Sequence, residues 1–245
     1  MKSPFSLPTI EKKEEYIQKN FNEIAPYYDI FNDLFTFGMH RSWKVKLLKF
    51  LNLKDAETMI DLCSGSGDIA LYATKQGKHL KIVACDFSEE MLKILNKRVE
   101  LLNLKDRIEI KKYNVLKLPK SFTSKFDVAT VGYGVRNVKD RIQFFKEVYR
   151  VLKKKGKFGI LEVGEIKPSF LEPIAHFFMK YFIPLIGWIL HRKKHPMYQY
   201  LPYSALAFPE PEQIVQELNS VGFKNITFYR VFFGASILYI AHKES

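Results

Sequence analysis

The sequence predicts an α/β fold: a doubly wound, mostly parallel sheet of seven strands with an antiparallel last strand. Two observations predict it. Five apolar runs of strand length alternate with segments of helical spacing, and this alternation is typical of parallel sheets. Two further runs near the C-terminus meet at Gly234, which indicates an antiparallel pair. With 245 residues, the chain is long enough for a sizeable core.

The first 50 residues are expected to form a helical, aromatic-rich cap ahead of a sheet domain over 51–245. Apolar residues recur among charges over 11–24, which indicates a helix. Residues 25–44 are dense in aromatics and have few regular spacings. A further helix is expected over 43–51.

The elements of the sheet domain follow in order. Strands are expected over 57–62, 80–85, 107–112, 126–131 and 157–162, with helices between them over 68–76, 88–102 and 140–152. A hydrophobic, basic insertion over 165–205 then interrupts the alternation. The chain closes with a helix over 210–220 and strands over 224–231 and 234–242.

The charge balance favours a polyanionic partner. The chain has 39 basic and 26 acidic residues, a formal net charge of +13. This charge suits nucleic acid, an anionic membrane surface or a phosphorylated ligand, although a solvated lysine-rich surface explains it without a partner.

The two cysteines indicate a reducing compartment. Cys63 and Cys85 fall at predicted strand ends, and no cysteine–histidine cluster offers a metal site. The N-terminus has no apolar signal core, and the chain has no uninterrupted apolar run of about 18 residues. We therefore expect a cytoplasmic protein without a transmembrane helix.

A glycine-rich loop follows the first predicted strand, where residues 59–68 read MIDLCSGSGD. Parallel sheets bind ligands at the carboxyl ends of their strands. Gly65 and Gly67 let the backbone turn sharply and approach a ligand closely. A tight strand-to-helix turn also explains these glycines without a ligand.

The acids of this loop discriminate between cofactors. A dinucleotide would place its pyrophosphate on the loop, where Asp61 and Asp68 would repel it. A cationic ligand without phosphate fits better. S-adenosylmethionine carries a sulfonium and an ammonium, and Asp61 is placed to neutralise that ammonium.

Polar residues also end the next two strands. Asp86 lies about twenty residues after the loop, where an acid accepts hydrogen bonds from ribose hydroxyls, and its neighbour Phe87 is a further cofactor-site candidate. Ser88 is explained as a helix cap. Asn114 is either an acceptor for the adenine amino group or a turn-forming residue. Three polar groups ending three consecutive strands are a stronger signal than any one alone.

Three segments carry a resemblance to a known family. YDIFNDLFTFGMHRSWK resembles its first signature, and GYGVRNVKDR resembles its Phe-Gly-x-Arg-Asn segment with Tyr133 in place of phenylalanine. YRVLKKKGKFGILEVG resembles its second signature, which includes Glu162. The glycine loop departs from the usual Ala-Gly-Gly-Thr-Gly, but Ser66 keeps a hydroxyl at the threonine position. Over residues 20–243 the sequence is thus similar to the UbiE/MenG family, the C-methyltransferases of ubiquinone and menaquinone biosynthesis.

This resemblance implies a Rossmann-like class I methyltransferase that uses S-adenosylmethionine. It also implies methyl transfer to a ring carbon of a reduced prenylated quinone, of the demethylmenaquinol or 2-polyprenyl-6-methoxy-1,4-benzoquinol type. By the family pattern, the residues that line the cofactor site are Ser66, Asp86, Asn114, Val115 and Gly132.

The implied reaction needs an ionised ring hydroxyl, because the ring carbon becomes nucleophilic when that hydroxyl loses its proton, whose pKa is roughly 10. Arg136 follows the fourth strand and is expected to stabilise the phenolate, although pairing with Asp140 explains it without function. Asn137 is expected to orient the hydroxyl. The candidates for the base are Asp29, His40 and a water held by Tyr28, whereas a packed N-terminal hairpin explains His40 without function.

The insertion is strongly apolar over 170–200 and includes the basic cluster HRKKH at 191–195. Prolines interrupt it too often for a bilayer span, but such a segment can lie in an anionic membrane interface. We expect it to cover the active site and admit the prenyl tail at the inner membrane face. The alternative is a lid that packs on the sheet domain or on the partner subunit of a homodimer.

Two rival classes are less well supported. For a nucleic-acid methyltransferase, neither cysteine is placed as a cytosine nucleophile, and GYGVRN is not the Asn/Asp-Pro-Pro-aromatic turn used on base amines. No RNA-binding module is visible, so no nucleic-acid partner is expected. A non-catalytic adapter with this fold is opposed by the acids at the strand tips. A class I methyltransferase of another lipophilic small molecule stays open.

Overall fold

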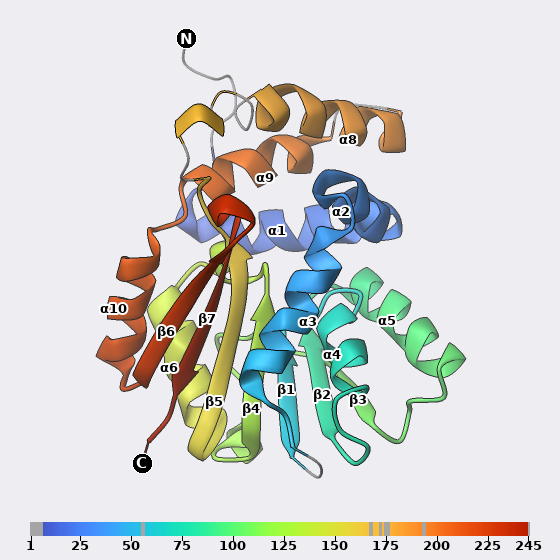
Figure 1. The fold of residues 1–245 in the computed structure, drawn as a ribbon. Coiled ribbons are helices and arrows are strands. Elements are labelled where there is room, and N and C mark those ends of the chain that lie inside the picture. Colours follow the sequence, from blue (N-terminus) through green and yellow to red (C-terminus); the bar gives the residue numbers. More distant parts are fainter. Residues whose placement is uncertain are drawn as a thin grey trace.

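A mixed sheet lies at the centre of the computed structural model, which describes residues 7–54, 57–166, 169–171, 173, 177–192 and 195–244. Seven strands of these residues pair in the order β3-β2-β1-β4-β5-β7-β6 (Figure 1). They are β1 (Thr58–Leu62), β2 (Lys81–Asp86), β3 (Ile108–Lys112), β4 (Phe126–Gly132), β5 (Leu152–Val163), β6 (Lys224–Val231) and β7 (Ser236–His242). Strands β1 to β5 pair in parallel, and β7 is antiparallel to both β5 and β6. The predicted α/β class and its antiparallel last strand are confirmed.

Helices cover both faces of the sheet, as a doubly wound fold requires. On one face lie α3 (Met39–Leu51), α4 (Asp68–Ala73) and α5 (Glu89–Leu101), whose apolar residues pack with Met59 of β1. On the other face lie α6 (Arg141–Val151) and α10 (Pro211–Val221), which pack with Ile60. Neighbouring residues of β1 join different clusters because successive strand side chains point to opposite faces.

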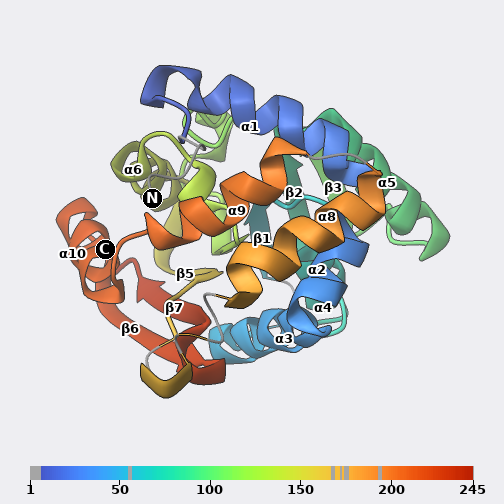
Figure 2. The same ribbon diagram turned by 90° about the horizontal axis from the view of Figure 1, so that it is seen from above.

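A third group of helices lies over the carboxyl ends of the strands (Figure 2). It consists of α1 (Ile10–Ile24), a 3-10 turn (Ala25–Tyr27), α2 (Tyr28–Thr36), a π-helical turn (Phe178–Phe182), α8 (Ile183–His191) and α9 (Pro196–Leu206). These lid helices bury a core of their own, to which Ile17, Phe31, Ile186 and Tyr198 belong. Two segments that lie far apart in the sequence therefore build one lid. Within the described residues, no helix has the length and apolarity to cross a bilayer.

The N-terminal stretch is more helical than its sequence indicates. Helix α2 was not expected, and α3 begins at Met39 rather than at residue 43. The apolar residues of α2 point both ways: Phe31 is buried against Tyr198, whereas Ile30 is 51% exposed. The apolar residues Tyr28, Phe31, Leu34 and Phe35 nevertheless recur at helical spacing, so the sequence of α2 carries a helix period that the dense aromatic residues around it obscured.

Strand β5 also begins earlier than residue 157. Helix α6 runs directly into it, because Leu152 pairs with Phe126 before the register shifts. Helix α4 is shorter than expected and ends at Ala73 rather than at residue 76.

Helix α3 rests directly on Gly159 of β5. A Cβ atom there would lie 2.7 Å from Leu51 Cδ1 and 3.1 Å from Leu47 Cδ1. Gly159→Val is therefore expected to lower the free energy of unfolding by about 1–3 kcal/mol, because the added methyl groups overpack this contact. Urea unfolding measures the change. The control Leu101→Ala, at a side chain that is 82% exposed, should stay within about 0.5 kcal/mol of the parent. An unchanged free energy in Gly159→Val would mean that α3 does not pack there.

Candidate active site

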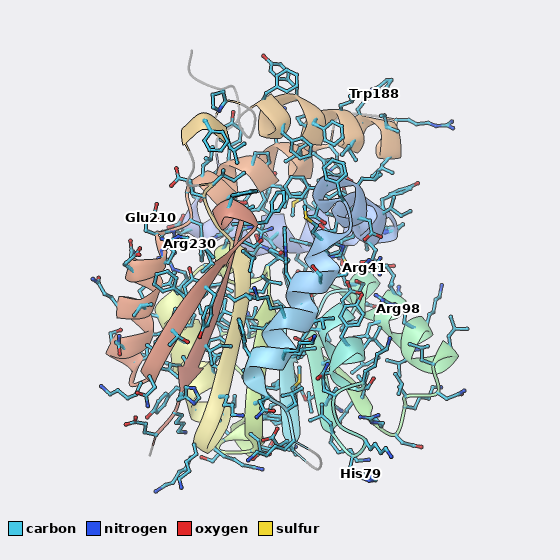
Figure 3. All side chains as sticks on the ribbon, in the orientation of Figure 1. Arg41, His79, Arg98, Trp188, Glu210 and Arg230 are labelled. Carbon is cyan, nitrogen blue, oxygen red and sulfur yellow. The ribbon has the colours of Figure 1, made fainter. Side chains whose placement is uncertain are left out.

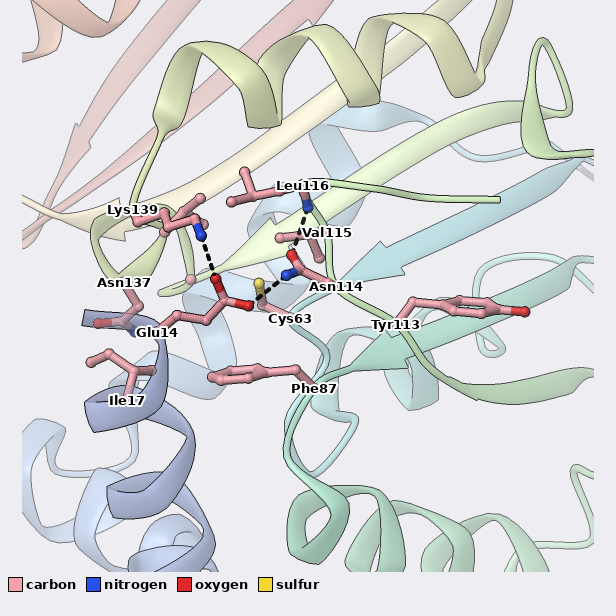
Figure 4. Close-up of a pocket in the computed structure, with 12 residues that line it drawn as sticks. Glu14, Ile17, Cys63, Phe87, Tyr113, Asn114, Val115, Leu116, Asn137 and Lys139 are labelled. Atoms are coloured by element: carbon pink, nitrogen blue, oxygen red, sulfur yellow. Dashed lines mark hydrogen bonds and ion pairs between the residues drawn. The ribbon is translucent and has the colours of Figure 1, made fainter. Parts of the chain in front are cut away.

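The candidate site lies at the carboxyl ends of β1 to β4, beneath the lid helices. Two cavities lie there, and Cys63 lines both of them. The first cavity is shown in Figure 4, and its lining includes Glu14, Phe87, Asn114, Val115, Asn137 and Val138. The lining of the second cavity includes Tyr28, Lys44, Asp61, Gly65, Ser66, Asp68, Gly132 and Tyr133. An elongated ligand that reaches from one cavity to the other would pass Cys63.

The glycine loop joins β1 to α4 through a left-handed backbone. The φ angles are 52° at Cys63, 54° at Gly65 and 88° at Gly67. Glycine adopts this conformation without strain. At Gly67 a Cβ atom would also collide with Leu95 of α5, so the loop sits directly against that helix. The glycines of the motif are thus explained by backbone geometry as well as by room for a ligand.

Asp61 is a buried carboxylate with unused hydrogen-bonding capacity. Only 1% of its surface is exposed. Thr130 Oγ1 donates to its Oδ1 at 2.7 Å, but no described residue donates to its Oδ2. Burial raises the pKa of Asp61 to about 7, against the opposing effects of the Thr130 hydrogen bond, the nearby Ala70 backbone amide and the charge of Lys44. An unpaired buried acceptor in a cavity wall is a site where a cationic or hydrogen-bond-donating ligand gains most.

Asp86 is buried, and both of its carboxylate oxygens already have hydrogen-bond partners. The Gly65 N–H donates to its Oδ2 and the Ser88 N–H to its Oδ1, each at 2.8 Å. Burial raises the pKa of Asp86, and these backbone amides oppose the rise. Ser88 is also the expected helix cap, since its Oγ accepts from the Met91 N–H. Asp86 thus ties the tip of β2 to the glycine loop.

Asn114 lies in the first cavity and is already engaged (Figure 4). Its Nδ2 donates to Glu14 Oε1 of α1 at 2.6 Å, and its Oδ1 accepts from the Leu116 N–H at 2.9 Å. Lys139 also pairs with Glu14, at 2.8 Å. Helix α1 therefore places a carboxylate at the mouth of this cavity, held by an amide and an ammonium.

A buried ionic network supports the second cavity. Asp68 accepts from Lys44 Nζ and from Arg98 Nη2, each at 2.8 Å. Burial alone would raise the pKa of Asp68, but Lys44 and Arg98 together lower it to about 2. Arg98 also donates to the Ser66 carbonyl at 2.9 Å, and Ser66 Oγ donates to Asp29 Oδ1 at 2.6 Å. Asp29 of α2 thus links the lid to the glycine loop.

Arg136 forms a buried ion pair with Glu162 and not with Asp140, which instead caps α6. Its Nη1 lies 2.5 Å from Glu162 Oε1, and its backbone N–H donates to Glu162 Oε2 at 3.1 Å. Burial disfavours the charged guanidinium, but the combined attraction of Glu162 and nearby groups raises the pKa of Arg136. Its buried Nε makes no hydrogen bond to a described residue. Lys13 of α1 holds the same turn through the Arg136 carbonyl at 2.8 Å.

Aromatic hydroxyls surround this arginine. Tyr28 lines the second cavity, and burial raises its pKa to about 12 against the opposing charge of Arg136. Tyr200 of α9 donates to Asn137 Oδ1 at 3.1 Å, while Asn137 Nδ2 donates to the Tyr133 carbonyl at 3.2 Å. The insertion therefore contacts the site through α9.

The predicted site residues do not all line the cavities. Phe87, Asn114, Val115 and Asn137 line the first cavity, and Tyr28, Asp61, Gly65, Ser66 and Gly132 line the second. The remaining candidates act at one remove from the lining: Asp29, Gly67, Asp86 and Arg136 contact residues that line it. His40 lies farther away on α3, where it is buried and bonds Asp33 at 2.9 Å, and burial lowers its pKa.

Some residues of the site carry no signal in the sequence. Glu14 lies in a lysine- and glutamate-rich helix that reads as a solvated surface. Lys44 stands beside a signature tryptophan but looks like any other lysine of this basic chain. Glu162 was matched to a signature, yet its pairing with Arg136 becomes visible only when β4 and β5 lie side by side.

Comparison with known proteins covers nearly the whole chain. The model of the ubiE/COQ5 methyltransferase family matches residues 9–243. A demethylmenaquinone methyltransferase from Leptospira interrogans is 35% identical, over 99% of this chain and 98% of the relative. A ubiquinone/menaquinone biosynthesis C-methyltransferase UbiE from Geotalea uraniireducens is 32% identical, over 96% of this chain and 99% of the relative.

Solved structures share the fold at lower identity. A SAM-dependent methyltransferase from Thermotoga maritima superposes with a TM-score of 0.66 at 18% identity, over 93% of this chain and 99% of that one. One from Aquifex aeolicus gives a TM-score of 0.60 at 19% identity, over 82% and 89%. These likenesses show the fold, and the sequence matches show the family: the chain belongs to the ubiE/COQ5 methyltransferase family.

Proposed function

We propose that this methyltransferase transfers the methyl group of S-adenosylmethionine to a ring carbon of a reduced prenylated quinone in respiratory quinone biosynthesis. The acceptor is of the demethylmenaquinol or 2-polyprenyl-6-methoxy-1,4-benzoquinol type. The names of the relatives support this reaction class. The observation that carries the proposal is Arg136, a buried, charged guanidinium whose Nε has no hydrogen-bond partner among the described residues.

The residues of the second cavity fit the methionyl end of the donor. Asp61 Oδ2 lacks a partner, and an ammonium there would satisfy it. The first cavity, lined by Phe87, Asn114 and Val115, fits the adenine. Asp86, at the tip of β2, bonds the Gly65 N–H of the glycine loop, and a carboxylate at this strand tip accepts from ribose hydroxyls. When bound, S-adenosylmethionine supplies an electrophilic methyl group on its sulfonium.

Arg136 and its neighbours suit activation of a phenol. A fixed positive charge lowers the pKa of a ring hydroxyl beside it and stabilises the phenolate that makes the ring carbon nucleophilic. Glu162 fixes one edge of the guanidinium, which leaves Nε for the acceptor oxygen. Asn137, held by Tyr133 and Tyr200, orients the hydroxyl.

Among the base candidates, a water held by Tyr28 has the best geometric support. Tyr28 lines the second cavity, and with a pKa of about 12 it stays protonated at neutral pH and can hold a water. The Asp29 carboxylate already accepts from Ser66 and Arg98. His40 bonds Asp33 outside both cavity linings. The phenol proton thus leaves to solvent rather than to a side chain. The methyl carbon exchanges its bond to sulfur for a bond to the ring carbon, S-adenosylhomocysteine is released, and the hydrogen of that ring carbon moves as a proton to the ring oxygen when the ring becomes aromatic again.

We further propose that the insertion over 165–205 is a lid that docks on an anionic membrane surface, where a prenylated acceptor resides. Helix α8 and the turn before it expose Phe177, Tyr181, Leu185, Trp188 and Ile189, each by half or more. Trp188 projects away from the sheet (Figure 3). Phe37, 73% exposed, extends the same apolar face from the end of α2, in contact with Phe178. Apolar patches with an interfacial tryptophan favour membrane contact.

One residue of the basic cluster at 191–195 is turned away from that surface. Arg192 is exposed, but His195 is buried and bonds Glu23 of α1 at 2.9 Å. Lys193 and Lys194 lie outside the described residues. The apolar face, rather than the basic cluster, therefore carries the membrane proposal.

Asp61→Asn should weaken S-adenosylmethionine binding by about tenfold to a hundredfold, because a neutral amide cannot balance an ammonium. Burial raises the pKa of Asp61 to about 7, so the carboxyl is largely neutral below pH 7. The affinity of the parent protein should therefore rise with pH between 5 and 7 by up to about tenfold per unit, while that of Asp61→Asn stays flat. Calorimetric titration measures both. Parallel pH profiles for the two proteins would contradict this role.

Arg136→Gln should lower kcat by about 10²–10³-fold, because the phenolate loses its charge partner. The Kd for S-adenosylmethionine should change by less than about threefold, which also reports on folding. The assay uses a short-chain demethylmenaquinol analogue, and the parent should methylate it when it is reduced and not when it is oxidised. The control Arg41→Gln removes another ion-paired arginine, bound to Asp33 outside both cavities, and should leave kcat unchanged. Turnover of Arg136→Gln within a few-fold of the parent would refute the role.

Trp188→Glu should abolish most co-flotation with anionic vesicles, because an acid on the apolar face opposes both burial and charge. The parent protein should float with anionic vesicles and less with neutral ones. The control Leu101→Glu places the same acid at an exposed apolar residue of α5, outside the lid. This variant should float like the parent. If the parent protein instead floats with neither type of vesicle and forms a concentration-dependent dimer that Trp188→Glu dissociates, that result would assign this face to a second copy of the chain.

A further inference from the structure

We infer that Lys44 of α3 binds the carboxylate of the donor's methionyl group, opposite the ammonium site at Asp61. This inference rests on the proposed use of S-adenosylmethionine. It adds a binding residue that neither the glycine loop nor the strand tips contain. Lys44 comes instead from the helix before β1, and it reaches the second cavity from the side.

The first support is the position of the Lys44 side chain. Lys44 lines the same cavity as Asp61, Ser64 and Gly65, and its side chain is only 10% exposed. It is close enough to Asp61 for its charge to oppose the rise in the pKa of that carboxyl. One cavity wall thus presents a carboxylate and an ammonium together. The methionyl group presents the complementary pair, an ammonium and a carboxylate on one carbon.

The second support is that Lys44 has hydrogen bonds to spare. A lysine ammonium donates three. Within the described residues, the one it makes goes to Asp68 Oδ2 at 2.8 Å. Lys44 is not the sole partner of the Asp68 carboxylate, because Arg98 Nη2 donates to its other oxygen at 2.8 Å. Two N–H groups of the Lys44 ammonium are therefore available to a ligand carboxylate.

The third support is the charge of the whole cluster. The carboxylates of Asp29, Asp61, Asp68 and Asp86 outnumber the cations Lys44 and Arg98, so the cluster is net negative when Asp61 is ionised. The donor carries two positive charges and one negative charge, a net of +1. Arg98 is not a competing carboxylate ligand, because it does not line the second cavity and its Nη1 and Nη2 already donate to Ser66, Asp68 and Asp29. Lys44 is therefore the cation left for the ligand.

The test deletes the carboxylate from the ligand as well as the ammonium from the protein. The probes are S-adenosylhomocysteine and its decarboxylated counterpart, which keeps the adenosine and the amine. Calorimetry measures both affinities on the whole chain. The parent should bind the decarboxylated probe at least tenfold more weakly. Lys44→Met should lose at least tenfold in affinity for S-adenosylhomocysteine and less than twofold for the decarboxylated probe. Lys44→Arg, which keeps the charge, should retain part of the parent's discrimination.

Controls separate binding from structural support. Arg98→Met acts through Asp68 and the glycine loop, so it should weaken both probes by the same factor. Lys44→Met combined with Asp68→Asn removes both members of the pair, leaves no unpaired buried carboxylate and should show the same loss of discrimination. If Lys44→Met or the double variant weakens both probes equally, Lys44 is only structural and the inference fails. If the parent binds neither probe, the proposed function itself fails.

Discussion

The site depends on one unfavourable burial: the carboxylate of Asp61 lies in the protein interior with one oxygen unpaired. The sheet imposes this position, because Asp61 sits inside β1 between the paired strands β2 and β4. Desolvation then raises its pKa towards neutrality. Such a carboxyl is a poor structural element but a strong binding site for a cation, since the ligand supplies the partner that the fold withholds.

Polar contacts join the lid helices to both cavities, because the lid has a hydrophobic core separate from those on the two faces of the sheet. The contacts that cross from lid to site include Glu14 with Asn114, Lys13 with the Arg136 carbonyl, Asp29 with Ser66, and Tyr200 with Asn137. Helices from the N-terminal segment and from the insertion thus contact the cofactor loops and the turn that contains Arg136 and Asn137. The same helices expose the apolar face around Trp188. The contacts to the site and the exposed apolar face therefore belong to one structural unit.

The sequence was sufficient for what periodicity and strand tips determine. The alternation predicted the sheet, and the residues at strand ends converge because parallel strands share one carboxyl edge. It was insufficient where partners come from distant segments. Glu14 and Asn114 are 100 positions apart, and Lys44 reaches Asp68 across 24. Helix α2 was missed although Tyr28, Phe31 and Phe35 of the lid core follow helical spacing, because apolar residues of the exposed face, such as Ile30 and Phe37, lie between and beside them.

The most direct measurement is the number of protons released when S-adenosylmethionine binds at pH 6, obtained by calorimetry in buffers of different ionisation enthalpy. With a pKa of about 7, Asp61 is protonated in most free molecules at that pH, and a bound ammonium requires it ionised. The account predicts release of nearly one proton per donor bound, on the order of 0.9, and almost none in Asp61→Asn. Binding heats that do not vary with the buffer would show that this carboxylate does not hold the donor.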